Sequence, residues 1–402
     1  MDFDVPDDLR DLLSVARTYA RTDLRATEHQ LDAIADPVEA YTSDAYAGVR
    51  ATGRSIGLHL LMLPEELGGL GLPANAFFLV LEELAAGGPA LALISLIDPL
   101  GAAFAGSRRK QHPWFEEYYT SFMDGDGAHS GAWAITEPDV GCDMYSRGTS
   151  FRCRAVPTAS GSGYVIDGAK SSWCSNGWLA DSLIVMIAVE PELGMDGTGV
   201  FLIPADWPGV ERGQPVSKVG LRALNQCDIS FQGCEVPAEF LLFPPGPSYD
   251  RVLKRGFVGP GNLSVGTTAL GIAQAAYELG LAYATEREQG GGAIAKHQLV
   301  AKKLFDAYTS IEASRLLLRQ AAWNMARGTV DMAAIYAARV SACRTAADVT
   351  HDMVLVHGGN GITKEYEIEK LWRDQQPLQM ADGTVDVVAM QAAGQLTGLD
   401  VR

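Results

Sequence analysis

The stretch Ala132-Trp-Ala-Ile-Thr-Glu-Pro-Asp-Val-Gly-Cys-Asp143 marks the point where this 402-residue chain changes character. From about Ala132 to Val236, short runs rich in β-branched and aromatic residues alternate with turn residues. The clearest runs are Tyr164–Ile166, Ser182–Val189, Gly199–Ile203 and Ile229–Phe231. This pattern predicts a β domain in the middle of the chain, with a turn between strands at Asp167-Gly168.

Upstream of this stretch, the sequence predicts helices. Pro6, followed by two aspartates, suits a helix N-terminus, and apolar residues then recur at helical spacing. These residues are Leu9, Leu12, Leu13, Ala16 and Ala20. Loops are expected around Asp36-Pro37 and from Pro64 to Pro73, and the glycine-rich segment 124–127 ends the helical pattern. We therefore expect a helical domain over residues 1–128.

Downstream, the chain becomes helical again after about Glu239. Val300, Leu304, Tyr308 and Ile311 fall on one helical face, and Gly328 breaks the pattern before a further helical stretch. The expected fold is α+β in the order α-β-α. The three predicted domains cover residues 1–128, 129–238 and 239–402.

Composition excludes several classes of partner. The chain has 49 acidic and 32 basic residues, a net charge of −17, which disfavours nucleic acids and anionic membranes. The longest apolar run, Leu84 to Ile97, is too short to span a bilayer and is interrupted by Gly87, Gly88 and Pro89. The acidic N-terminus resembles neither a secretory signal nor a transit peptide, so we expect a cytoplasmic protein without membrane insertion.

The remaining motif searches narrow the chemistry. The six cysteines show no CxxC spacing, so reduced thiols and no metal site are expected. The sequence contains neither a Walker pattern nor a strand-borne GxGxxG, which disfavours ATP and nicotinamide sites. Gly53-Arg-Ser-Ile-Gly57 has the spacing of a hydrolase elbow, but the residues before Ser55 predict a helix, where that elbow needs a strand.

Segments spread over nearly the whole chain resemble the acyl-CoA dehydrogenase family. They include residues 132–143 and, in family order, Pro64–Leu72, Trp173–Gly177, Gly220–Leu224, Tyr283–Arg287, His297-Gln298, Val356–Gly361, Trp372–Asp374 and Ala381–Thr384. The resemblance implies an N-terminal α-helical domain, a middle β-barrel-like domain and a C-terminal four-helix bundle. It also implies an FAD enzyme that oxidises acyl-CoA thioesters.

The resemblance assigns FAD contacts to particular residues. Thr136 would bind the pyrimidine end of the flavin, Ser175 would lie near N5, and Trp173 would lie close to the ring. Arg287 and Gln298 resemble residues that reach the FAD of a neighbouring subunit, which implies a homotetramer or homodimer. The full set of expected cofactor-binding residues is Ile135, Thr136, Cys142, Trp173, Ser175, Arg287, Gln298, Gly358, Gly359 and Thr384.

The same resemblance identifies the catalytic base as Asp382, where most family members have glutamate. Some relatives carry the base on the first long helix of the C-terminal domain, but the matching position here is Gly261. Burial beside an apolar substrate should raise the pKa of the Asp382 carboxyl group toward the working range. The alternative is that Asp382 only caps a helix or closes an Asx turn.

Three functions fit these observations. The first is an acyl-CoA dehydrogenase that passes electrons to an electron-transfer flavoprotein, with an acyl group whose shape suits a base one methylene shorter than glutamate. Such an acyl group could be cyclic, branched or otherwise non-standard. The second is a flavin oxidase of the same fold, similar to nitroalkane oxidase, which also employs an aspartate base. The third is a non-catalytic partner subunit of a dehydrogenase.

Overall fold

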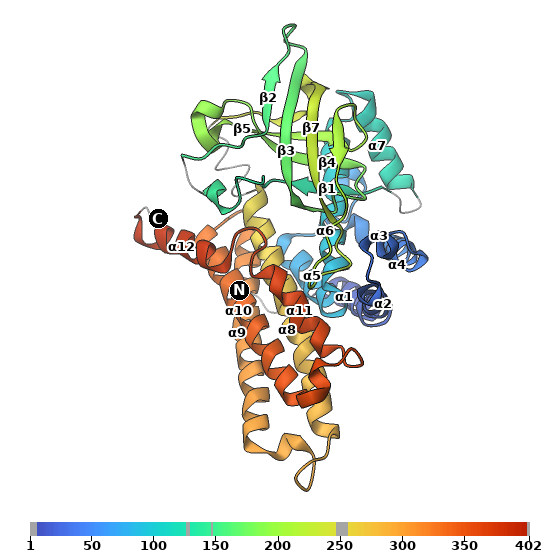
Figure 1. Cartoon of the computed structure of the whole chain (residues 1–402), viewed down its shortest axis with the longest axis vertical. Helices are drawn as coiled ribbons and strands as arrows, with labels where there is room; N and C mark the ends of the chain where they lie inside the picture. The colour runs from blue at the N-terminus through green and yellow to red at the C-terminus, as the bar shows by residue number, and fades with distance from the viewer. Residues whose placement is uncertain (1–5, 126–128, 146–147, 247–255, 400–402) are drawn as a thin grey trace.

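The computed structural model describes residues 6–125, 129–145, 148–246 and 256–399. A β domain follows the N-terminal helices in the chain and precedes the C-terminal helices, and it lies at the top of the molecule in Figure 1. The N-terminal helices are α1 (Asp7–Tyr19), α2 (Arg25–Ala33), α3 (Pro37–Tyr41), α4 (Asp44–Ser55), α5 (Ala74–Gly87), α6 (Pro89–Arg108) and α7 (Pro113–Asp124). Helix α1 begins directly after Pro6, as the sequence predicts. Ser55 lies at the end of helix α4 and donates to the carbonyl of Thr52, so the hydrolase elbow is absent there.

Helix α6 is longer than the apolar run predicts. The apolar run is interrupted as the sequence predicts, because α5 ends at Gly87 and Gly88 is extended. Pro89 then starts a new helix, since proline lacks only an N–H that has no partner in the first turn. By length and composition α6 could cross a membrane, and no other helix among the described residues could. It packs against α5, α7, α8 and strand β1 (Gly131–Ala134), so its apolar residues serve the protein core.

The strands form one sheet in the order β6-β7-β3-β1-β4-β5-β8, with β2 paired to β3 and β4. The other strands are β2 (Arg154–Pro157), β3 (Gly163–Ser175), β4 (Ser182–Ala188), β5 (Thr198–Pro204), β6 (Val210–Arg212), β7 (Gln226–Pro237) and β8 (Leu241–Phe243). The four runs predicted from sequence lie in β3, β4, β5 and β7. Every residue of β4 and β5 is buried, which explains their continuous apolar sequence.

The prediction of a turn at Asp167-Gly168 is wrong. Both residues lie inside β3, where the register against β7 shifts between Ile166 and Gly168. Gly168 has φ +129°, and a Cβ there would lie 2.6 Å from the Cα of Cys153. The glycine therefore marks a β-bulge with a close backbone approach, and the strand continues through it.

The C-terminal region contains α8 (Gly259–Glu286), α9 (Gln298–Ala326), α10 (Met332–His357), α11 (Ile368–Leu378) and α12 (Val385–Thr397). Helix α8 packs against α9, α10 and α11, and also against α5 of the N-terminal region. Its glycines allow these close contacts: a Cβ at Gly271 would lie 2.6 Å from the Cβ of Ala85, and one at Gly280 would lie 2.1 Å from the sulfur of Met353.

A buried ion network joins all three regions. The Lys370 ammonium on α11 lies 2.9 Å from the Glu28 carboxylate on α2 and 2.5 Å from the Asp374 carboxylate one turn away. The other Asp374 oxygen accepts from the backbone N–H of Leu221, which precedes β7, at 2.7 Å. Burial alone would lower the pKa of Lys370, but the carboxylates of Asp374 and Glu28 outweigh it and raise that pKa.

We expect Lys370→Met to lower the free energy of unfolding by about 3–5 kcal/mol, because it leaves two buried carboxylates without their cation. Urea denaturation followed by circular dichroism measures this change. The control is Lys364→Met, which removes a lysine that is 70% exposed and pairs with Glu369 at 2.9 Å. That change should cost at most about 1 kcal/mol. Equal losses in the two variants would contradict a structural role specific to Lys370.

Candidate active site

Asp382 lies in the turn between α11 and α12. The backbone N–H of Val385 donates to the carbonyl of Gln379 at 3.0 Å and closes this turn. Asp382 has φ +51°, a conformation that aspartate adopts at a cost of about 1–2 kcal/mol. The cap of α12 is Thr384, whose hydroxyl accepts from the N–H of Val387 at 3.3 Å. Capping of α12 therefore does not account for Asp382.

The Asp382 side chain lies directly against Gly261 in the first turn of α8. A Cβ added at Gly261 would lie 2.7 Å from Oδ2 of Asp382, which is closer than such atoms approach in proteins. Residues 261 and 382, the two positions that carry the base in different relatives, thus lie next to each other. Glycine at 261 leaves the space that the Asp382 carboxylate occupies.

The surroundings raise the pKa of the Asp382 carboxyl group. Withdrawal of the carboxylate from bulk water is the main cause, and the nearby positive charge of Arg339 acts in the opposite direction. By accessible area Asp382 is nevertheless exposed, so protein atoms crowd the carboxylate without sealing it from solvent. A carboxylate with a raised pKa that a ligand can still reach has the properties of a general base.

Arg339 on α10 binds the backbone of the Asp382 turn. Its side chain is completely buried, and its guanidinium donates to the carbonyls of three successive residues: Ala381, Asp382 at 3.2 Å and Gly383 at 2.5 Å. It also donates to Oδ1 of Asn262 on α8 at 2.6 Å. The turn is therefore fixed to two helices by one side chain.

A second group of predicted residues lies on β1, β3 and the segment that follows β1. Ser175 on β3 pairs in register with Trp133 on β1. The Thr136 hydroxyl lies 2.6 Å from that of Ser171, and the Thr136 carbonyl accepts from the Ser171 N–H at 2.8 Å. Trp173 is 59% exposed, which is unusual for a tryptophan in a strand and leaves an aromatic surface available to a ligand.

A buried lysine supports this second group. Lys170 is fully buried and its ammonium lies 2.7 Å from the Glu137 carboxylate and 3.1 Å from the carbonyl of Ile135. The Glu137 carboxylate also accepts from the N–H groups of Arg152 and Cys153. These bonds fix the backbone on both sides of Thr136. Cys142 lies farther along, at the start of a short helix, and is partly exposed.

An aromatic contact joins the Thr136 and Ser175 group to the Asp382 turn. The Trp133 ring on β1 stacks on the Phe257 ring, with centroids 4.7 Å apart. Phe257 is four residues before Gly261, which touches Asp382. The predicted base and the predicted flavin-ring contacts therefore belong to one region, where the β domain meets the start of α8.

The other predicted cofactor residues lie at the opposite end of α8. Arg287 follows the last residue of α8 and Gln298 is the first residue of α9, and both are exposed. Gly358 is also at this end, because the preceding His357 stacks on Tyr283 of α8 at 4.2 Å. Arg287 is about 40 Å along the helix from Gly261. The C-terminal end of α8 lies at the lower end of the bundle in Figure 1, away from the β domain.

Backbone geometry at this far end favours glycine. Gly290 and Gly291, in the connection between α8 and α9, have φ +63° and +95°. Gly358 has φ +61°, and neither Gly358 nor Gly359 would bring a Cβ within 4 Å of another atom. The backbone at 358–359 is therefore open to close approach by a ligand.

Sequence reasoning missed several residues that hold the site together. Gln226 on β7 donates to the Ser175 hydroxyl at 3.2 Å and to the Trp173 carbonyl at 3.3 Å. Lys170 and Arg339 fix the backbone around Thr136 and Asp382. The available signal for Arg339 was a lone arginine in the apolar stretch Ala337-Ala-Arg-Val340, where a charge must find buried partners.

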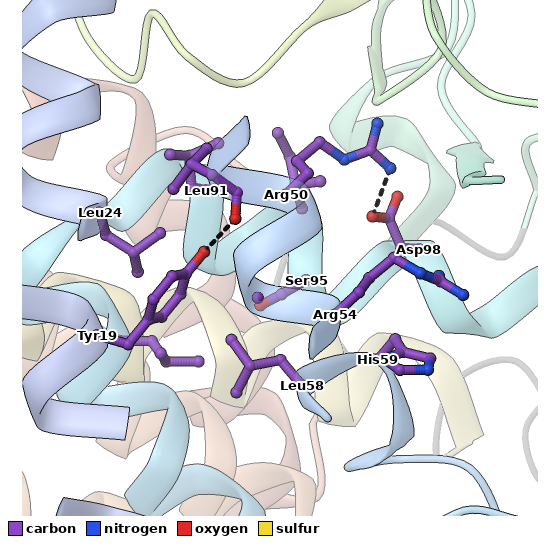
Figure 2. Close-up of a pocket in the computed structure, with 13 residues that line it drawn as sticks. Tyr19, Leu24, Arg50, Arg54, Leu58, His59, Leu91, Ser95 and Asp98 are labelled. Carbon is purple, nitrogen blue, oxygen red and sulfur yellow. Dashed lines mark hydrogen bonds and ion pairs between the residues drawn. The ribbon is translucent and has the colours of Figure 1, made fainter. Parts of the chain in front are cut away.

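A small hollow within the N-terminal helices is not the site itself. It measures about 50 Å³, and Tyr19, Arg50, His59, Ser95 and Asp98 are among its lining residues (Figure 2). This space accommodates water molecules but no cofactor. Asp98 pairs with Arg50 at 2.9 Å and accepts from the Asn176 amide at 2.7 Å. The wall of the hollow thus supports the segment that carries Trp173 and Ser175.

Comparison with known proteins identifies the family of the fold. Three family models match: the acyl-CoA dehydrogenase N-terminal domain over residues 6–114, the middle domain over 132–234 and the C-terminal domain over 253–397. A 2-methylacyl-CoA dehydrogenase of Solanum tuberosum is 31% identical, over 82% of this chain and 77% of the relative.

Solved structures extend the match to the whole chain. Butyryl-CoA dehydrogenase of Megasphaera elsdenii superposes with a TM-score of 0.86 at 26% identity, covering 99% of this chain and 100% of that one. A chain from a study of the electron transferring flavoprotein of Acidaminococcus fermentans gives 0.85 at 27% identity, with 98% and 99% covered. This chain therefore belongs to the acyl-CoA dehydrogenase family of FAD-dependent oxidoreductases that act on CoA thioesters.

Proposed function

We propose that this enzyme forms a 2,3-enoyl-CoA from a saturated acyl-CoA, with Asp382 as the base that removes the α-proton. The proton passes from the α-carbon to the Asp382 carboxylate as the electron pair of that C–H bond forms the new double bond. Bound FAD supplies the acceptor for the hydride that leaves the β-carbon. Both electrons of the substrate oxidation then leave the enzyme for an electron-transfer flavoprotein.

The observation that carries this proposal is the position of the Asp382 carboxylate. It lies against Gly261, it is accessible to a ligand, and its pKa is raised by loss of hydration. A raised pKa makes the carboxylate a stronger base than an ordinary aspartate. The non-catalytic alternative would leave the positive φ of Asp382 and the support of its backbone by Arg339 without a chemical use.

The side chains present suit FAD. Thr136 and Ser175 supply hydroxyl groups near an exposed tryptophan surface, where a flavin ring needs hydrogen-bond partners and a flat apolar wall. Arg287 supplies a cation, and Gly358-Gly359 supplies open backbone, for a pyrophosphate.

The distance between the Asp382 region and the cofactor residues at the far end of α8 supports an oligomer. Because about 40 Å of α8 separates Arg287 from the Asp382 region, one FAD molecule in one chain does not reach both. We propose that Arg287, Gln298, Gly358 and Gly359 complete the FAD site of a neighbouring subunit. Exposed apolar residues on α9 provide contact surface for such assembly: Leu299, Phe305, Tyr308 and Leu316.

The length of the Asp382 side chain also affects which acyl groups the site accepts. An aspartate base is one methylene shorter than glutamate, so either the substrate lies closer or the acyl group has a different shape. We propose a short acyl group that is branched, cyclic or otherwise non-standard. Two relatives, a 2-methylacyl-CoA dehydrogenase and a butyryl-CoA dehydrogenase, are named for a branched and a short acyl chain, which supports this proposal.

An aspartate at position 382 also fits one alternative function, that of a flavin oxidase similar to nitroalkane oxidase. An oxidase consumes oxygen and releases hydrogen peroxide during turnover. A dehydrogenase bleaches its flavin anaerobically with acyl-CoA and turns over slowly in air. A flavin that neither acyl-CoA nor nitroalkane bleaches would contradict both functions.

We expect Asp382→Asn to slow anaerobic flavin bleaching by about 1000-fold across a panel of acyl-CoA thioesters, because an amide does not accept the α-proton. Stopped-flow absorbance measures the rate, and the flavin spectrum reports FAD content. The control is Asp386→Asn on α12, whose side chain is 92% exposed. Full activity of correctly folded Asp382→Asn would overturn the assignment of the base.

In the same panel, Asp382→Glu should change the order of preferred acyl groups, because the longer side chain moves the carboxylate by about the length of one bond. Rates for straight, branched and cyclic acyl groups of equal carbon number make the comparison. An unchanged order of preference, with only a uniform change in rate, would contradict the argument from reach.

Subunit complementation tests the shared FAD site. We expect Arg287→Ala and Asp382→Asn each to be inactive alone but active in hetero-oligomers isolated with two different affinity tags. If Arg287 serves the neighbouring subunit, a mixed dimer contains one site with both changes and one with neither. If Arg287 serves its own subunit, every site carries one change and no activity returns, which contradicts the proposal.

A further inference from the structure

The contacts of Arg339 extend to the chemistry of the turn it holds. Its guanidinium binds the carbonyls of Ala381, Asp382 and Gly383. In a planar trans peptide the C=O and the N–H point in opposite directions. The N–H groups of Asp382, Gly383 and Thr384 therefore point away from Arg339.

This orientation matters because carbanion formation beside a thioester places negative charge on the carbonyl oxygen. Backbone N–H groups fixed in advance stabilise such a charge more effectively than groups that must reorient. The turn also needs support because Asp382 has φ +51°, which strains a residue with a side chain, whereas Gly383 adopts φ +96° without strain. Three carbonyl bonds from one planar, forked side chain determine the conformation of both residues.

We propose that Arg339 is a positioning residue for catalysis, which holds the turn that carries the Asp382 carboxylate and fixes the direction of the Asp382 N–H toward the thioester oxygen. Arg339 touches neither substrate nor cofactor and acts through the turn. The inference rests on the proposed role of Asp382. It adds a reason for a buried arginine in the apolar interior of the bundle.

The surroundings of Arg339 are consistent with this specific task. Outside the turn, Arg339 also donates to Oδ1 of Asn262, a neutral group one residue after Gly261. The guanidinium Nε has no hydrogen-bond partner among the described residues. Arg339 thus binds no carboxylate directly there, and most of its hydrogen bonds go to the Asp382 turn. A residue that served only to neutralise a buried acid would show the opposite pattern.

The test is a series of Arg339→Lys and Arg339→Met, with Arg344→Met as the control. Arg344 is five residues later on the same helix, is 60% exposed and lies 3.9 Å from Asp386. Each purified holoenzyme is assayed for kcat, KM and FAD content with the best acyl-CoA of the panel. Hydrogen–deuterium exchange of residues 379–386 is measured on the same proteins without substrate, and their Tm is recorded.

We expect Arg339→Lys to lower kcat about 10- to 100-fold with little change in KM, because the lost interaction acts in the transition state. Exchange should accelerate in residues 379–386 and stay unchanged in the helices. Arg339→Met should show larger effects of the same kind, whereas Arg344→Met should match the wild type.

Two results would overturn the proposal. One is wild-type kcat and wild-type exchange in Arg339→Lys. The other is a loss confined to Tm, FAD content and exchange throughout the bundle, which would make Arg339 a residue of the fold alone. Failure of the proposed function can be told apart from failure of this inference. If Asp382 is not the base, Asp382→Asn retains activity. The exchange measurement needs no substrate and still reports whether Arg339 holds the turn.

Discussion

Lys370 holds a positive charge at the place where the three regions of the chain meet. Its partners are a carboxylate from the second N-terminal helix and one from its own helix, and the latter also binds the backbone that leads into β7. Charges removed from water are stable only when their partners are in place. The network therefore constrains the relative positions of the three regions more strictly than apolar packing alone would, because apolar packing tolerates small shifts.

The site depends on that placement because it is built from all three regions. The backbone bound by Asp374 continues into β7, where Gln226 supports Ser175, and Asn176 is held by Asp98 of α6. Helix α11, which carries Lys370 and Asp374, ends one turn before Asp382. The same small set of buried polar bonds thus fixes the base on one side and the ligand-facing strand on the other.

The fold could be predicted largely from local patterns, because the spacing of apolar residues indicates helices and strands. The errors came where tertiary contact overrides a local signal: Asp167-Gly168 is typical of a turn, yet the backbone of Cys153 makes it a bulge. Family resemblance pointed to Asp382. The supports of Asp382 were not predictable, because Arg339 meets residues 381–383 only after two helices pack, just as Glu28 meets Lys370 across the whole chain.

The contact between Gly261 and Asp382 constrains how such an enzyme can change by mutation. Any side chain at 261 would collide with the carboxylate at 382, and an acidic one would also place two like charges together. A glycine at 382 without a new acid at 261 would leave no base in this turn. Relocating the base between these positions therefore takes two substitutions whose single intermediates are both impaired.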